Sequence, residues 1–183
     1  MIQKPNKSYI ICSTPRTGST LLCSLLKSSG IAGVPESYFR AQDLGMWEDK
    51  WGLPQDHGFE EFLGAIIKAG STPNGAFGIR IMWGTMEELT DNLATLYPDE
   101  SDLLTRAFGS CQFIYLKRED YVAQAVSRLR AEQTDIWHST EGNEKITPEY
   151  DFTRLQEFEK EAETHNKAWE DWFTNNGNKT YRV

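Results

Sequence analysis

The feature that most constrains the fold is the stretch YIICSTPRTGSTLLCSLL, residues 9–26. Its first four residues are apolar and β-prone, which is typical of a buried strand, whereas the four leucines at its end repeat at helical spacing. The polar segment STPRTGST, residues 13–20, connects the two. A strand that leads through such a loop into a helix is typical of a βαβ unit. The sequence therefore predicts an α/β fold with a parallel sheet flanked by helices.

The same pattern recurs further along the chain. Residues 76–83 (AFGIRIMW) and 112–116 (QFIYL) are short apolar runs bounded by turn residues, so each predicts a strand. After the second run, Val122, Val126 and Leu129 suit one face of a helix. We expect the polar loops at the carboxyl ends of these strands to meet at one edge of the sheet.

The remaining segments complete one expected domain over residues 1–183. Apolar positions at helical spacing predict a long helix over residues 151–174, and the closing TYRV, residues 180–183, is typical of the start of a strand. Residues 42–62 and 139–148 are polar or without a period, so both are predicted to be loops or lids.

Composition narrows the possible functions. A formal net charge of −8 argues against a general nucleic-acid binder, because affinity for a phosphate backbone comes mainly from clustered lysines and arginines. Cys12, Cys23 and Cys111 are widely spaced and predict neither a disulfide framework nor a zinc site. The N-terminal residues lack the apolar core of a signal peptide, and no run reaches the roughly 20 apolar residues of a membrane span. We therefore expect a cytoplasmic protein without a transmembrane segment.

The STPRTGST loop predicts a site for an anion. A loop between a buried strand and a helix points free backbone N–H groups at one position, where the helix dipole favours negative charge. Gly18 lets a ligand approach the backbone, Arg16 adds a planar charged group that matches phosphate oxygens, and Thr17, Ser19 and Thr20 add hydroxyl donors. The alternative is an ordinary strand–helix turn capped by serine and threonine.

Two common nucleotide motifs do not match this loop. The Walker A motif needs a lysine after its last glycine to reach the β- and γ-phosphates, and a glycine five residues earlier. This chain has Ser19 after Gly18 and Ser13 at the earlier position. The three-glycine pattern of dinucleotide-binding folds is also missing. An ATP-dependent phosphotransferase is therefore only a weaker alternative.

Four segments, in order, resemble the bacterial trehalose 2-sulfotransferase family. They are STPRTGST, GIAGVPESYF (residues 30–39), GIRIMW (residues 78–83) and KREDYVAQAVSRLRAEQTDIW (residues 117–137). The resemblance implies a P-loop-like sulfotransferase fold and 3′-phosphoadenosine 5′-phosphosulfate (PAPS) as sulfuryl donor. It also implies that a homodimer can form and that members continue past the position of Val183. The chain is therefore expected to be either truncated or a naturally short member.

The resemblance also assigns donor-binding roles. It implies that Arg118 and Ser127 bind the 3′-phosphate, and that the loop holds the 5′-phosphosulfate through Pro15, Arg16, Thr17, Gly18, Ser19 and Thr20. Their places in the predicted fold support the assignment of Arg118 and Ser127 to the 3′-phosphate, because Arg118 ends a predicted strand and Ser127 lies on the next helix. The alternative for Arg118 is an ion pair with Glu119 or Asp120 on a solvated turn.

Sulfuryl transfer needs positioning and charge stabilisation, by analogy with phosphoryl transfer, and Arg16 with the loop N–H groups suits the second task. No metal is expected, because the transferred group carries less negative charge than a phosphoryl group. Glu36 is the candidate general base. The family pattern of glycine, any residue, proline, any residue, glutamate would instead place the base at Ser37. Glu36 is thus either the base in a bent loop or a surface acid.

Several other conspicuous residues allow two interpretations. Trp83 and Trp137 suit stacking on a sugar ring, although core packing is the commoner use of tryptophan. Trp47 and Trp51 suit an acceptor lid, and Arg80 is expected to point from a strand end toward the site.

The sequence therefore predicts an enzyme that transfers sulfate from PAPS to a hydroxyl of a carbohydrate or glycolipid, with a trehalose-like or lipopolysaccharide-type acceptor. A second hypothesis is a non-catalytic nucleotide-binding or interaction module of the same fold, which the displaced carboxylate and the early C-terminus favour. The ATP-dependent phosphotransferase is the third.

Overall fold

A computed structural model describes residues 4–137 and 147–183 of the chain. Within them, four parallel strands form one sheet in the order β2-β1-β3-β4. The strands are β1 (Lys7–Ser13), β2 (Ala76–Met82), β3 (Cys111–Leu116) and β4 (Thr180–Arg182). Strands β1 and β3 are interior, and Ile10, Ile11 and Cys12 of β1 are buried, as expected for a strand that is covered on both faces.

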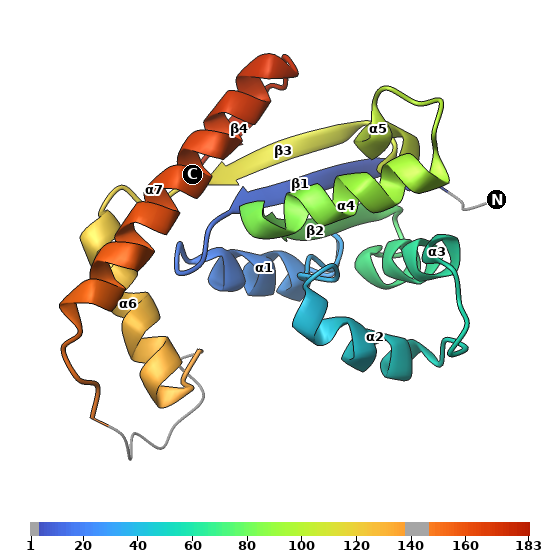
Figure 1. The fold of residues 1–183 in the computed structure, drawn as a ribbon. Helices are drawn as coiled ribbons and strands as arrows, with labels where there is room; N and C mark the ends of the chain where they lie inside the picture. The colour runs from blue at the N-terminus through green and yellow to red at the C-terminus, as the bar shows by residue number, and fades with distance from the viewer. Residues whose placement is uncertain (1–3, 138–146) are drawn as a thin grey trace.

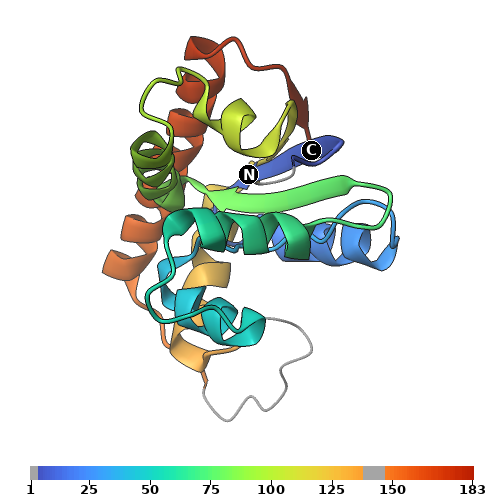
Figure 2. The same cartoon turned by 90° about the vertical axis from the view of Figure 1, so that its right-hand side faces the viewer.

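Helices cover both faces of the sheet (Figures 1 and 2). Helix α1 lies against one face, α4 and α7 lie on the other, and α3 runs beside β2. The helices are α1 (Ser19–Ser28), the 3-10 helix η1 (Ala41–Asp43), α2 (Leu44–Trp51), α3 (Phe59–Gly70), α4 (Trp83–Leu96), α5 (Leu103–Phe108), α6 (Tyr121–Thr134) and α7 (Phe152–Asn175). None of the helices in the described ranges is long and apolar enough to cross a membrane.

Side-chain alternation in the strands separates a core face from a site face. Ile10 and Cys12 of β1 are buried in a cluster that also contains Trp169 and Phe173 of α7. Arg80 of β2 is in register with Ile11, and its guanidinium contacts α1 on the opposite face. A charged side chain thus lies on the α1 face, beside the loop that precedes that helix.

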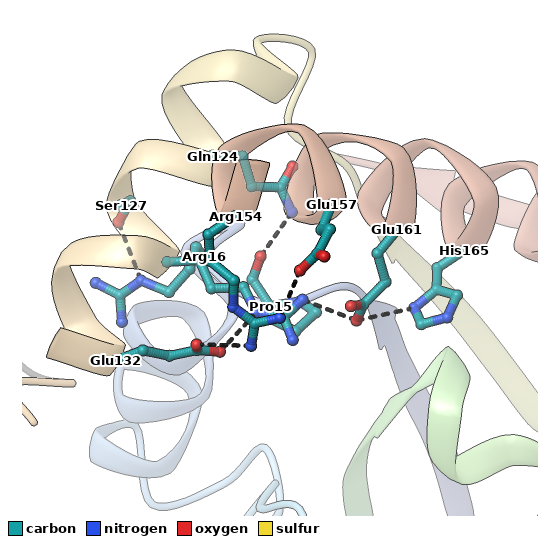
Figure 3. Close-up of polar contacts among 10 residues, drawn as sticks. Pro15, Arg16, Gln124, Ser127, Glu132, Arg154, Glu157, Glu161 and His165 are labelled. Atoms are coloured by element: carbon teal, nitrogen blue, oxygen red, sulfur yellow. Dashed lines mark hydrogen bonds and ion pairs between the residues drawn. The ribbon is translucent and has the colours of Figure 1, made fainter. Parts of the chain in front are cut away.

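Helices α6 and α7 pack side by side at the carboxyl end of the sheet (Figure 1). Arg154 of α7 bridges Glu132 of α6 and Glu157 of its own helix at 3.1 and 2.7 Å (Figure 3). Gln124 of α6 donates from Nε2 to the carbonyl oxygen of Pro15 at 2.6 Å (Figure 3). The helix pair is therefore fastened directly to the loop after β1.

The predicted strands and the long C-terminal helix are confirmed, but two local predictions are wrong. Residues 42–62 are not a loop, because they contain η1, α2 and the start of α3. An aromatic cluster stabilises this region: Trp47 stacks on Trp51, with 5.3 Å between ring centroids, and meets Tyr38 edge-on at 5.0 Å. The prediction of which residues form the buried face of α6 is also wrong.

On α6, Leu129 is buried as predicted, whereas Val122 and Val126 are exposed. Gln124 and Ala125 take the buried positions instead. The reason is that this helix docks on polar backbone of the loop after β1, so the buried face needs a hydrogen-bond donor there.

Candidate active site

A cavity of about 810 Å³ lies beside the N-terminus of α1, at the carboxyl ends of β1 and β3. We call it the main cavity. Ligands of open parallel sheets bind at this edge. The structure brings together in its lining seven of the residues predicted from the sequence: Arg16, Gly18, Ser19, Thr20, Glu36, Arg118 and Ser127.

The loop after β1 has the backbone shape of an anion site. Arg16 and Gly18 both have a left-handed conformation, with φ of 67° and 91°. Such alternation points successive N–H groups into one concavity. Thr17 stabilises the loop from within, since its Oγ1 donates to the carbonyl oxygen of Thr14 at 3.0 Å. The strained Arg16 conformation, rare outside glycine, is typical of functional loops.

The side chain of Arg16 turns toward α6, where Ser127 lies (Figure 3). Its Nε donates to Ser127 Oγ at 3.0 Å and its Nη1 to the carbonyl oxygen of Trp137 at 2.7 Å. Arg118 lies next to it and donates from Nη1 to the Arg16 carbonyl oxygen at 3.4 Å. Burial, and then the positive charge of Arg118, lower the pKa of Arg16. An anion between the two guanidinium groups would relieve this repulsion.

The acidic neighbours of Arg118 have other partners. Glu119 faces Lys117 at 4.0 Å, and Asp120 caps α6 by accepting from the Ala123 backbone N–H at 2.8 Å. The solvated ion pair considered for Arg118 is therefore not what the structure shows, and its guanidinium lines the main cavity.

Arg80 occupies the opposite end of the loop, as its strand position predicted. Its Nη1 donates to Thr20 Oγ1 at 2.8 Å and to Ser19 Oγ at 3.4 Å, at the first residues of α1. Its Nε donates to Ser37 Oγ at 2.8 Å. A guanidinium thus connects the start of α1 to the segment that carries Glu36.

Glu36 lines the main cavity despite its displacement by one residue. Its carboxylate meets Lys27 at 3.3 Å, and its carbonyl oxygen accepts from the Arg80 backbone N–H at 3.0 Å. Upstream, Gly33 lies so close to β2 that a Cβ there would be 2.7 Å from the Gly78 nitrogen. The segment is therefore held against β2, and both Glu36 and Ser37 border the cavity.

The four tryptophans predicted either to stack on a sugar, Trp83 and Trp137, or to form an acceptor lid, Trp47 and Trp51, separate into two groups. Trp47 and Trp137 line the main cavity, Trp47 from α2. Trp83 packs edge-on against Trp169 with 5.0 Å between ring centroids, and Trp51 belongs to the aromatic cluster around Tyr38. Trp83 and Trp51 therefore pack within the fold.

Charge in the main cavity is opposite to that of the whole chain. Four arginines line it against two carboxylates, Glu36 and Asp43. One of these arginines, Arg40, pairs with Asp43 at 3.3 Å. Within the described ranges no group of three or more His, Cys, Asp or Glu side chains is arranged to hold a metal ion. The cavity is suited to a ligand with separate anionic groups.

Comparisons with known proteins agree on one family. The family model described as Stf0 sulphotransferase matches residues 8–183. A trehalose 2-sulfotransferase of Mycobacterium tuberculosis is 27% identical over 198 residues, covering 93% of this chain and 74% of that protein. A trehalose 2-sulfotransferase of Mycolicibacterium smegmatis is 26% identical over 195 residues, covering 91% and 73%. Because the family model spans nearly the whole sequence, this chain belongs to the Stf0 sulphotransferase family.

Proposed function

We propose that this protein transfers a sulfuryl group from PAPS to a hydroxyl of a carbohydrate or glycolipid. The observation that carries the proposal is that two cationic positions share one cavity, one at the start of α1 and one at Ser127. PAPS carries anionic groups on both its 3′ and 5′ positions, so it needs two such positions. The trehalose 2-sulfotransferases among the relatives support a sugar-containing acceptor.

In the proposed reaction the acceptor oxygen attacks sulfur in line with the bond to the 5′-phosphate. The sulfur–oxygen bond to the phosphate breaks, its electron pair leaves on adenosine 3′,5′-bisphosphate, and a new bond forms between sulfur and the acceptor oxygen. The proton of the acceptor hydroxyl passes to Glu36. Cationic side chains and loop N–H groups offset the charge that develops on the leaving phosphate.

Two measurements test this proposal. Calorimetry is expected to show binding of adenosine 3′,5′-bisphosphate, and labelled PAPS is expected to transfer sulfate to at least one member of a panel of sugars and glycolipids. Absence of nucleotide binding would contradict the proposal. Binding without turnover on any acceptor would favour the non-catalytic module instead.

Sulfate transfer is expected to be unaffected by EDTA, because arginines and backbone N–H groups supply the positive charge at the site. The measurement is the initial rate of transfer with EDTA and with added Mg²⁺. An ATP-dependent phosphotransferase behaves differently, since its metal bridges the β- and γ-phosphates. A rate that falls to background in EDTA and returns with Mg²⁺ would favour that alternative.

A Glu36→Gln variant is expected to lower kcat by about 100-fold or more, because a general base contributes on the order of 10² to 10⁴ in rate. Affinity for adenosine 3′,5′-bisphosphate is expected to stay unchanged, since the amide keeps the shape of the side chain. Initial-rate kinetics and calorimetry measure the two quantities.

Lys27→Ala is the matched control for Glu36→Gln. It removes the partner of Glu36, but the Lys27 side chain is 56% exposed, and exposed ion pairs contribute little. We expect at most a small change in rate. Sulfate transfer by Glu36→Gln at the wild-type rate would remove Glu36 from the mechanism.

A further inference from the structure

We propose that Arg80 binds the 5′-phosphate and sulfuryl end of the donor, a role that the family resemblance implied for the loop with Arg16. The inference rests on the proposed function, because it names which cation serves which end of the nucleotide. It divides three of the four arginines that line the main cavity into a 5′ group, formed by Arg80, and a 3′ group, formed by Arg16 and Arg118.

The contacts of Arg80 leave part of its guanidinium available. Three hydroxyl oxygens accept from Nε and Nη1, those of Ser37, Thr20 and Ser19. Among the residues described, none accepts a hydrogen bond from Nη2, and no carboxylate lies within ion-pair distance of this side chain. Neutral hydroxyls orient the cation but do not neutralise it. A half-buried arginine with this surrounding favours an anionic ligand.

The guanidinium of Arg80 lies where the loop after β1 leads into α1. Its hydroxyl partners Ser19 and Thr20 are the first two residues of α1 and follow Gly18 directly. At Gly18, no atom of the described residues other than its two neighbours in the chain lies within 4 Å of the position that a Cβ would take. Backbone N–H groups, the positive end of the helix dipole and one guanidinium therefore surround the same open space.

The other arginines of the cavity have different surroundings. Arg16 donates to Ser127 and to the Trp137 carbonyl oxygen. Arg118 donates to the backbone carbonyl oxygen of Arg16. Arg40 is paired with Asp43. Arg80 is therefore the cation placed at the start of α1, where a 5′-phosphate would meet the loop.

The backbone around Arg80 explains why this cation is well positioned for charge stabilisation. Arg80 lies on β2 in register with Ile11 of β1, and its N–H holds the Glu36 carbonyl oxygen at 3.0 Å. A guanidinium on a paired strand needs little reorganisation as charge grows on the leaving oxygen. The same residue holds the segment with the proposed base, so donor and base are positioned from one strand.

Truncated nucleotides test this division. We would measure the affinity of adenosine 3′,5′-bisphosphate, adenosine 5′-phosphate and adenosine 3′-phosphate by calorimetry for wild type and three variants. Arg80→Gln is expected to lower the affinity for the two ligands with a 5′-phosphate by about 10- to 100-fold, the range for a charged hydrogen bond. Its affinity for adenosine 3′-phosphate is expected to fall by less than about threefold. Arg16→Gln and Arg118→Gln are expected to show the reverse pattern.

The outcomes separate the inference from the proposed function. If wild type binds none of the three ligands, the proposed function fails. If wild type binds them and Arg80→Gln weakens all three equally, Arg80 is only structural. If Arg16→Gln selectively weakens the 5′-phosphate ligands, the division is reversed. Should Arg80→Gln not fold, Arg80→Lys replaces it, because it keeps the charge and loses the planar fork; selective weakening of the 5′-phosphate ligands is again expected, and equal weakening overturns the inference.

Discussion

A Trp169→Ala variant is expected to unfold with a free energy about 3 to 5 kcal/mol below that of the wild type, as for other large-to-small changes of core aromatics. Trp169 is 1% exposed and contacts the rings of Trp83 and Phe173. Its Nε1 also donates to the carbonyl oxygen of Ser13 at 3.2 Å, at the end of β1. Urea denaturation monitored by circular dichroism measures the loss.

Two variants separate packing from hydrogen bonding at this position. Trp169→Phe keeps most of the ring but leaves the Ser13 carbonyl oxygen without its donor, so we expect a loss of about 1 to 3 kcal/mol. Trp172→Ala, on the same helix but only partly buried, is expected to cost less than Trp169→Ala. A loss below about 1 kcal/mol for Trp169→Ala would mean that α7 contributes little to the core.

The strands were predictable because their signal is local. Each is a short apolar run, and their parallel pairing follows from the alternation with helices. Helix α2 was not predictable, because the edge-on contact of its Trp47 with Tyr38, which lies outside the helix, forms only in the folded chain. The buried face of α6 was missed for a related reason. Gln124 can be buried because it donates a hydrogen bond to the carbonyl oxygen of Pro15, which lies far away in sequence.

The candidate site shows the same limit. The loop residues could be named because glycine, arginine and hydroxyl side chains between a strand and a helix indicate an anion site. The direction of the Arg16 side chain could not be predicted, because it depends on the left-handed backbone of Arg16 and on a hydrogen bond to Ser127, 111 positions later. Arg80 did carry a signal: it is a lone charge in an apolar strand, which indicates a side chain that needs polar partners.

A Gly18→Val variant is expected to weaken binding of adenosine 3′,5′-bisphosphate by about 100-fold or more, which corresponds to about 2.7 kcal/mol. The side chain would project into the open space at Gly18, where the ligand must approach the backbone N–H groups. The φ of 91° also strains any residue with a Cβ, at about 1 to 2 kcal/mol. Calorimetry measures the affinity, and urea denaturation measures the stability.

Gly30→Val separates the loss of affinity from the loss of stability, because Gly30 resembles Gly18 in its positive φ and in the open space around its Cβ position. Its φ is 70°, and in the part of the chain that the structure describes no atom beyond its two chain neighbours lies within 4 Å of the position that a Cβ would take. Gly30 follows the far end of α1 and is not part of the lining of the main cavity. We expect both variants to lose similar stability and only Gly18→Val to lose affinity. If both lose affinity in proportion to stability, strain alone explains the effect, and the loop at Gly18 is not where the nucleotide meets the backbone.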